Sequence, residues 1–353
     1  MNESRRSFLN DLLDTATPSG FEAAGQRRWI EYVSTFADEV QTDDYGNAIA
    51  ILEGDENGPT VALTGHGDEI GFMVRNITDD GMIGLTPIGG SDRTVSKGQH
   101  VEIHTDSGPI AGVVGQAAIH LRDGGEESIS DINEQYVDIG ATDAEEAGEV
   151  VERGDPITFR QTVSELSNGR IAARGLDNRV GIWAAAEGLR RAADADPEAT
   201  VCAVSTVQEE VGLQGAKMVA FNLTPDVVVA TDVTHATDSP VAPATSANGV
   251  ALGEGPVVAR GSANHTAVIS AAREAASNAD IDIQLAASGT RTGTDADAFY
   301  TARGGVPSLN LGIPNRYMHT PVEVVELADL NATADLLAAF ATEAGNRSFG
   351  PDF

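Results

Sequence analysis

Two adjacent acids, Glu209 and Glu210, directly follow an apolar run at residues 201–207. A short run rich in β-branched residues predicts a buried parallel strand, which would deliver both carboxylates to its carboxyl end. Because successive side chains on an extended backbone point to opposite sides, a site that uses both acids must give them different roles. The alternative is a solvated strand end, since most charged pairs face water.

Two other apolar runs are also followed by side chains that could bind a metal ion. His66 and Asp68 follow the apolar run 60–64, and Asp232 follows the apolar run 227–231. In a His-x-Asp pair at a strand end, the carboxylate can orient the imidazole toward a metal ion. A lone histidine is more often structural, so the case for chemistry depends on the whole set of strand ends.

Two more candidates complete this set. Asp177 stands where a helical pattern begins, and its alternative role is that of a helix N-cap. His319 follows an extended run, in a polar loop closed by prolines. Ligands of mostly parallel sheets bind beyond the carboxyl ends of the strands, so all these side chains are expected to meet there.

The candidates comprise two histidines, several carboxylates and no thiolate. Such a donor set suits a pair of divalent transition ions, zinc or cobalt, with one carboxylate bridging them. The chain has one cysteine, Cys202, and it lies inside an apolar run. We therefore expect a small buried side chain there, and neither a disulfide nor a cysteine-based zinc site.

Alternating helical and extended patterns must position these residues. Helical patterns cover residues 3–16, 21–37, 212–221, 264–278 and 331–344, and one more helix follows Asp177. Extended patterns cover residues 47–52, 60–64, 201–207, 227–231, 281–285 and 306–311. Strands that alternate with helices predict an α/β fold with a mostly parallel mixed sheet flanked by helices.

The segment 73–163 has a different pattern. It is rich in Gly, Thr and short alternating runs, and it predicts a small β-rich domain inserted into a main domain of residues 1–72 and 164–353. His100 and His104 have the spacing of a helical metal pair, but they lie in an alternating strand pattern. A solvated strand face is the better interpretation of these two histidines.

Acidic residues dominate the charge of the chain. Its 353 residues include 54 acids and 22 bases, for a net charge of −32, and only Lys97 and Lys217 are lysines. This surface is a poor partner for nucleic acid or an anionic membrane. It is similar to the surfaces of proteins from halophiles, in which molar salt screens self-repulsion.

The sequence shows neither of two common targeting signals, a membrane span and a signal peptide. No apolar run approaches the roughly 18 residues of a membrane span, and the first residues have no signal-peptide pattern. We therefore expect a cytoplasmic protein.

Six motifs are spread over nearly the whole chain: GHGDEIGFMV (65–74), LDNRVG (176–181), VQEEVGLQGA (207–216), ATDV (230–233), GTDA (293–296) and IPNRYMHTPVE (313–323). Together they closely resemble those of the M42 metallo-aminopeptidases of the tetrahedral (TET) type. The resemblance implies a zinc-exopeptidase-like domain with two metal ions. It also implies an inserted small β-barrel-like domain that helps to assemble homododecamers.

The resemblance further implies how the ligands divide between the two ions. Asp177 would bridge them. Glu210 and His319 would complete one site, and His66 and Asp232 would complete the other.

The remaining motif residues receive different roles from the resemblance. Glu209 would be the general base, and Asp68 would orient the neighbouring histidine. Asn178 stands where many relatives have a second Asp, and we interpret it as non-ligating. No role is implied for Thr294 or Asp295.

The implied reaction is removal of N-terminal residues from peptides. A related deacylase acting on N-acylated amino acids is the first alternative. A metal-binding or assembly protein without turnover is the second. Free-amino and N-acetyl substrates would distinguish the first two.

The charge of the chain leads to a prediction about salt. Subunits that each carry −32 repel one another when packed closely, and molar salt shortens the Debye length to about 3 Å. Lowering the salt to tens of millimolar should therefore dissociate or inactivate the protein, as measured by light scattering and activity. Unchanged assembly and activity across that range would contradict a halophilic design.

Overall fold

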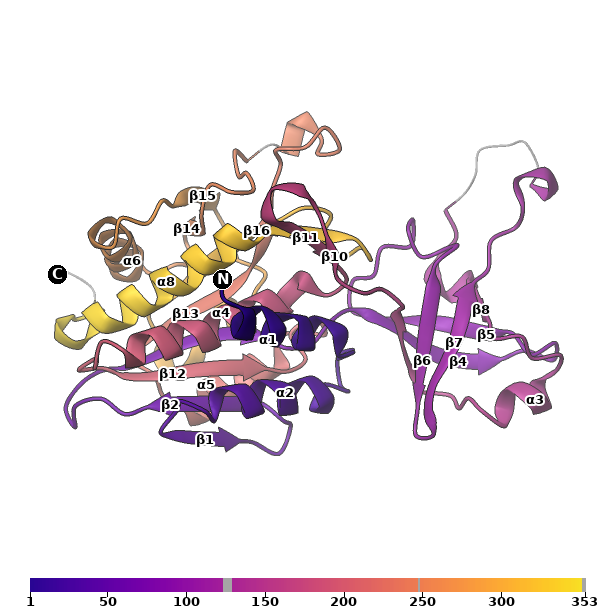
Figure 1. Cartoon of the computed structure of the whole chain (residues 1–353), viewed down its shortest axis with the longest axis horizontal. Helices are drawn as coiled ribbons and strands as arrows, with labels where there is room; N and C mark the ends of the chain where they lie inside the picture. The colour runs from indigo at the N-terminus through magenta and orange to yellow at the C-terminus, as the bar shows by residue number, and fades with distance from the viewer. Residues whose placement is uncertain (123–128, 247, 351–353) are drawn as a thin grey trace.

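An eight-stranded mixed sheet forms the centre of the larger of two lobes in the computed structural model, which describes residues 1–122, 129–246 and 248–350 (Figure 1). In spatial order its strands are β1 (Glu39–Thr42), β2 (Ala48–Leu52), β12 (Thr200–Thr206), β3 (Thr60–His66), β13 (Val227–His235), β16 (Ser308–Asn315), β14 (Val257–Gly261) and β15 (Gln284–Ser288). The four central strands β12, β3, β13 and β16 run parallel. Their carboxyl ends therefore meet at one edge, as the sequence predicts.

Helices cover both faces of this sheet. One face packs against α1 (Glu3–Asp14), α2 (Ala23–Val33), α4 (Leu176–Ala193), α6 (Thr266–Asn278) and α8 (Leu327–Glu343), and the other against α5 (Gln214–Asn222) and α7 (Ala296–Phe299). Strand residues alternate between the two cores, so that Val201 faces α4 whereas Cys202 faces α5, where it is buried as expected. Among the described residues, no helix has the length and apolarity needed to cross a membrane.

Helix α4 is the central helix of the first core. It contacts β3, β12, β13 and α8, and almost all of its side chains are buried, including the fully enclosed Trp183. A helix that is apolar on most sides is typical of a core position. Its first turn carries Asp177, so the packing of α4 fixes where that carboxylate lies.

The smaller lobe is a closed β-barrel (Figure 1). Its strands, in order around the barrel, are β4 (Gly71–Ile77), β5 (Ile83–Ile88), β8 (Tyr136–Asp138), β7 (Gly108–Val114), β6 (His100–Thr105) and β9 (Pro156–Phe159), and α3 (Ala144–Gly148) precedes β9. The barrel has a separate apolar core. The expected inserted β-rich segment is thus a barrel, although residues 123–128 of the predicted range 73–163 lie outside the described residues.

The two histidines of the alternating pattern lie on a strand, as predicted. His100 begins β6, and His104 near its end forms a hydrogen bond between Nε2 and Thr158 Oγ1 at 2.8 Å. Strand geometry, rather than a helix, therefore explains their spacing.

A second, three-stranded sheet lies beside the larger one. It consists of β10 (Ser164–Glu165), β11 (Arg170–Ala173) and β17 (Glu323–Glu326). Ala173, just before α4, pairs with Glu323 at the start of β17. These strands are too short to be recognised from periodicity, yet they bring the segment after His319 next to the segment before Asp177.

Several predicted boundaries are wrong. The strand expected at 281–285 is β15 at Gln284–Ser288, because Asp280 is left-handed (φ 53°) and pairing with β14 begins only at Gln284. Helix α8 begins at Leu327 rather than at residue 331.

The two acids that follow the central strand are not in an extended segment. β12 ends at Thr206, and Gln208 has a left-handed backbone (φ 56°), so Glu209 and Glu210 lie in a turn. The expected alternation of their side chains along a strand is therefore wrong, because the turn and not the pleat sets their directions.

Near the middle of α4, a buried carboxylate joins three elements of the larger lobe. The Glu187 side chain is fully buried and accepts hydrogen bonds from Tyr32 on α2 and from Arg190 (3.0 Å) and Arg191 (3.2 Å) on its own helix. Arg5 of α1 lies 3.2 Å away. Burial alone would raise the pKa of Glu187, but the bonds from Arg190 and Tyr32 lower it below its usual value.

Replacing this carboxylate should destabilise the fold. Removing one partner of a buried ion pair costs about 3–5 kcal/mol, and we expect Glu187→Gln to reach about the lower value because its arginines are partly exposed. The folded-state pKa is lowered, so the contribution exists above the unfolded-state pKa of about 4.3 and is lost as the pH falls below it.

Urea denaturation at pH 7 and at pH 4 measures this contribution. Glu31→Gln is the control, since Glu31 pairs with Arg28 at 3.4 Å on the exposed surface, where such pairs contribute about 0–1 kcal/mol. Equal stability of the two variants at pH 7 would contradict the prediction.

Candidate metal centre

The predicted residues converge at the carboxyl ends of the central strands. His66 ends β3, where it is level with Thr206 of β12, and Asp232 lies near the end of the adjacent β13. The Nε2 atom of His66 is 3.3 Å from Asp177 Oδ1 and 3.7 Å from Asp232 Oδ1. These three side chains are buried and form one compact group.

A second group shares Asp177. The Nε2 atom of His319 lies 3.3 Å from Asp177 Oδ2 and 3.6 Å from Glu210 Oε1. The two oxygens of Asp177 therefore face different histidines. When four ligands surround a zinc-sized ion at about 2.0–2.2 Å, neighbouring donor atoms lie about 3.3–3.6 Å apart. The separations from the two Nε2 atoms, 3.3–3.7 Å, are close to this range.

Glu209 lies at the border of the first group. Its Oε2 is 3.9 Å from His66 Nε2, farther than the oxygens of Asp177 and Asp232. Donor atoms of His66, Glu209 and Asp232 all lie within 4.8 Å of one another, as do those of His66, Asp177 and Glu210. The described residues thus bring together all five predicted ligands and Glu209.

The clustered acids change one another's protonation. Burial, opposed by His66 and reinforced by Asp232, raises the pKa of Glu209 to about 10. Burial also raises the pKa of Glu210 well above its usual value. For Asp177 burial acts in the same direction, but hydrogen bonds from His319 and His66 outweigh it and lower the pKa. Cations among these carboxylates would remove this mutual repulsion.

Backbone and side-chain oxygens orient both imidazole rings. His66 Nδ1 lies 3.2 Å from both the carbonyl and the Oδ1 of Asp68, the predicted orienting residue. His319 Nδ1 lies 3.2 Å from the carbonyl of Gly90, in the barrel lobe. Because these oxygens only accept, each Nδ1 carries a proton. Each Nε2 becomes able to bind a metal when it loses the proton that it donates to Asp177.

Gly90 leaves space for the His319 ring beside it. A Cβ atom at this position would lie 3.0 Å from His319 Nδ1. A side chain there would therefore displace the ring by a few tenths of an ångström.

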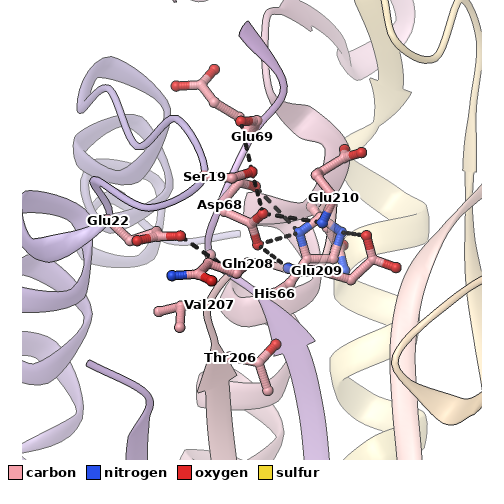
Figure 2. Close-up of polar contacts among 12 residues, drawn as sticks. Ser19, Glu22, His66, Asp68, Glu69, Thr206, Val207, Gln208, Glu209 and Glu210 are labelled. Atoms are coloured by element: carbon pink, nitrogen blue, oxygen red, sulfur yellow. Dashed lines mark hydrogen bonds and ion pairs between the residues drawn. The ribbon is translucent and has the colours of Figure 1, made fainter. Parts of the chain in front are cut away.

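Asp68 also holds the turn that carries the two acids (Figure 2). Its Oδ1 accepts a hydrogen bond from the amide of Glu209 at 3.0 Å, and its Oδ2 accepts one from the amide of Glu210 at 3.2 Å. Ser19 Oγ donates to the same Oδ2 at 2.6 Å. One buried carboxylate thus orients a histidine ring and the backbone of both neighbouring acids.

Glu323 plays a corresponding part on the other side of the site, and the sequence analysis missed it. It is buried, and it accepts hydrogen bonds at 2.9 Å from the amide of Asp177 and from the amide of His319. Burial, with the charge of Asp177, raises its pKa to about 8. Glu323 is the last residue of the motif at 313–323, but the pairing of β11 with β17 creates its contact with Asp177, which the motif does not show.

Asn178 was interpreted as non-ligating, and the structure gives it other contacts. Its Oδ1 accepts from the amide of Gly181 at 3.0 Å, and its Nδ2 donates to the carbonyl of Thr231 at 2.8 Å. The Asp177–Asn178 peptide is cis. Asn178 therefore makes the capping-type bond that was the alternative role of Asp177, and it ties α4 to the strand of Asp232.

The GTDA loop, which received no role, lies behind the site. Asp295 is buried and its Oδ2 accepts from Thr206 Oγ1 at 2.5 Å. Burial raises the pKa of Asp295 to about 7. The hydrogen bonds of Thr294 are local: its Oγ1 pairs with that of Thr292 and accepts from the amide of Ala296, and its carbonyl accepts from the amide of Asp297.

Comparison with known proteins identifies the family. A family model described as M42 glutamyl aminopeptidase matches residues 46–336. The chain belongs to the M42 peptidase family. A lysyl aminopeptidase from Pyrococcus furiosus is 34% identical over 98% of this chain and 99% of its own length. This M42 chain is accordingly a metal-dependent aminopeptidase, as the motifs implied.

Solved structures of M42 peptidases show the same fold. A TET aminopeptidase from the marine sediment archaeon Thaumarchaeota archaeon SCGC AB-539-E09 is 30% identical, with a TM-score of 0.93 over 98% of both chains. The TET1 peptidase of Pyrococcus horikoshii, described as assembling into a tetrahedron or a large octahedral shell, is 32% identical, with a TM-score of 0.85 over 96% of this chain and 99% of its own. The predicted α/β fold with an inserted barrel is confirmed.

Removing the carboxylate of Glu323 should weaken metal binding, because the backbones of Asp177 and His319 would lose their common acceptor. Loss of such an outer contact typically costs about 10–100-fold in metal affinity. Glu323→Leu should show this loss in metal titrations followed by mass spectrometry.

Asp329→Leu is the matched control for this substitution. Asp329 is a buried carboxylate that also accepts two amide hydrogen bonds, from Gly253 (2.8 Å) and Gly255 (2.9 Å). We expect it to lower stability without changing metal affinity. Equal metal affinity in the two variants would contradict a specific role for Glu323.

Proposed function

We propose that this M42 aminopeptidase holds two divalent ions, zinc or cobalt, and uses them to remove residues from the N-termini of peptides. The observation that carries the proposal is the geometry of Asp177, whose two oxygens each lie 3.3 Å from the Nε2 of a different histidine. A carboxylate in that position can bridge two ions. The donor set of two imidazoles and several carboxylates, without a thiolate, suits zinc or cobalt.

The distances support a division of ligands around Asp177. His66 and Asp232 would hold one ion, and His319 and Glu210 would hold the other, with each pair of atoms 3.6–3.7 Å apart. When bound, the ions would acidify a water molecule and polarise the peptide carbonyl.

Glu209 is the residue left to move the proton. In this division it ligates neither ion, yet it lies 3.9 Å from His66 and is buried in the same cluster. Its carboxylate would take a proton as the water oxygen bonds to the carbonyl carbon. It would then give that proton to the amine nitrogen as the C–N bond breaks.

The acidic surroundings favour a substrate with a free, positively charged α-amino group. An N-acylated amino acid lacks this charge, so the related deacylase reaction is the less favoured alternative. Aminoacyl anilides should be hydrolysed, and their N-acetyl counterparts should not. The opposite preference would establish the deacylase, and no turnover of either by metal-loaded protein would leave a binding or assembly role.

We also propose that the chain forms a closed homo-oligomer, a dodecamer, in which the barrel lobe supports contacts between subunits. A solved relative, PhTET1-12s, is described as a dodecamer and is 32% identical, with a TM-score of 0.84 over 97% of this chain. Closed symmetric assemblies are common for identical subunits. The proposed location is the cytoplasm, where cysteines remain reduced, and this is consistent with the single buried, unpaired Cys202. A stable monomer in light scattering at high salt would exclude the dodecamer.

The two neighbouring acids should respond differently to the loss of charge. Glu209→Gln should keep the fold and both ions but lose most turnover, because general-base catalysis contributes about 10²–10⁴-fold. Glu210→Gln should instead weaken the binding of one ion, because a neutral amide is a poor ligand for such a cation. Metal content measured beside kcat distinguishes the two roles. Metal loss in Glu209→Gln with retention in Glu210→Gln would reverse them.

A further inference from the structure

The segment between α1 and α2 contacts residues beside the metal centre that lie far from this segment in the sequence (Figure 2). Thr17 Oγ1 donates to the carbonyl of Gly67 at 2.7 Å, and Ser19 Oγ donates to Asp68. Glu22, at the start of α2, turns its carboxylate toward Gln208, the residue before Glu209. The segment at residues 17–22 therefore contacts the site as well as joining two helices.

Side-chain oxygens hold the backbone of the turn at residues 207–210. Four consecutive amides donate to them: that of Val207 to Asn47 Oδ1 (3.0 Å), that of Gln208 to Glu22 Oε1 (3.1 Å), and those of Glu209 and Glu210 to Asp68. Each acceptor comes from a different part of the chain. The carbonyls of residues 207–209 in turn accept from amides of residues 212–215. The direction of the Glu209 side chain therefore depends on these bonds and on the side-chain acceptors, and not on a strand ladder.

Gln208 is the residue in this turn that most needs an external partner. Its left-handed backbone (φ 56°) costs a residue with a side chain roughly 1–2 kcal/mol. Such a conformation persists only when its surroundings hold it, and it is typical of functional sites. Its carbonyl accepts from the amide of Gln214 at 3.1 Å, and the bond from its amide to Glu22 restrains the other side of the residue, next to the proposed base.

Helix capping does not explain the position of Glu22. Its side chain makes no capping bond to α2, although it occupies the N-cap position. It is 5% exposed, and its Oε1 accepts both the amide of Gly20 (2.7 Å) and that of Gln208. Burial raises its pKa to about 7, so placing a carboxyl group here is costly. The amide bonds partly offset that cost.

We propose that Glu22 is a positioning residue for catalysis: by holding the Gln208 amide it aims the Glu209 carboxylate at the reacting water. This inference rests on the proposed function, in which Glu209 moves the proton. It predicts that Glu22 affects the rate of the chemical step rather than metal binding or substrate affinity.

Two substitutions of Glu22 distinguish the effect of its hydrogen-bond acceptor from the effect of its side-chain volume. Glu22→Leu keeps the approximate volume but has no acceptor, and Glu22→Gln keeps an acceptor oxygen. We expect Glu22→Leu to lower kcat about 10–100-fold, the order expected for a displaced catalytic group, with KM and both ions unchanged. Glu22→Gln should restore kcat to within about threefold of wild type.

Gln26→Leu is the matched control. Gln26 lies one turn later on α2 and is also 5% exposed, but it bonds to Ser205 Oγ (2.6 Å) and to the carbonyls of Ser205 and Gly46 (both 2.9 Å). It thus holds the strand before the turn. We expect it to lower the thermal midpoint about as much as Glu22→Leu while kcat stays near that of wild type.

The outcomes decide the proposal. A lowered kcat in Glu22→Leu, with full metal content and rescue by Glu22→Gln, supports it. Unchanged kcat, loss of metal, or an equal loss of kcat in Gln26→Leu overturns it. Crystal structures of wild type and Glu22→Leu give a readout independent of turnover: the Gln208 peptide and the Glu209 carboxylate should move, and unmoved groups overturn the proposal. Wild-type protein without turnover would refute the proposed function. The two crystal structures would still show whether Glu22 positions the Glu209 carboxylate.

Discussion

Mutual repulsion among buried carboxylates is the constraint on which the rest of the site depends. Asp177, Glu209, Glu210 and Asp232 share one edge of the sheet with two imidazoles, and burial strengthens every interaction among them. Left to themselves, these acids would bind protons, as the raised pKa values of Glu209 and Glu210 indicate. The surrounding structure must therefore hold them together until cations compensate their charge.

The protein meets this constraint through the backbone. Asp68 and Glu323 each bind two amides of the acidic cluster and its loops, and so fix the positions of the acids without neutralising them. Glu69 is a buried carboxylate whose charge is balanced by two arginines. Arg174 and Arg179 form ion pairs with it and lower its pKa to about 2, against the opposing effect of burial. These ion pairs connect the turn after His66 to the start of α4, and so link two segments that carry proposed metal ligands.

The barrel lobe is part of the site as well as a neighbour of it. The carbonyl of Gly90 accepts from His319, so a displacement of the barrel would release one of the two imidazoles. In an assembly whose subunits meet through the barrel, contacts between subunits would be coupled to this ring. The charge of −32 per chain would make such contacts sensitive to salt, because counterions would screen the repulsion between acidic surfaces.

Local pattern was sufficient for the central strands and the longer helices, and it indicated the acids and histidines that the fold brings together. Apolar runs that end in His or Asp predict both a buried parallel strand and what lies at its end, because parallel strands align their carboxyl ends. Tertiary structure alone decided the turn at Gln208, the pairing of β11 with β17, and the contacts of Glu22, Asn178, Glu323 and Gly90. Each of these contacts joins residues that lie far apart in the chain, and the hydrogen bonds of a buried polar group depend on which segments the fold brings beside it. Periodicity reports only which side of an element is apolar, so it cannot reveal such partners.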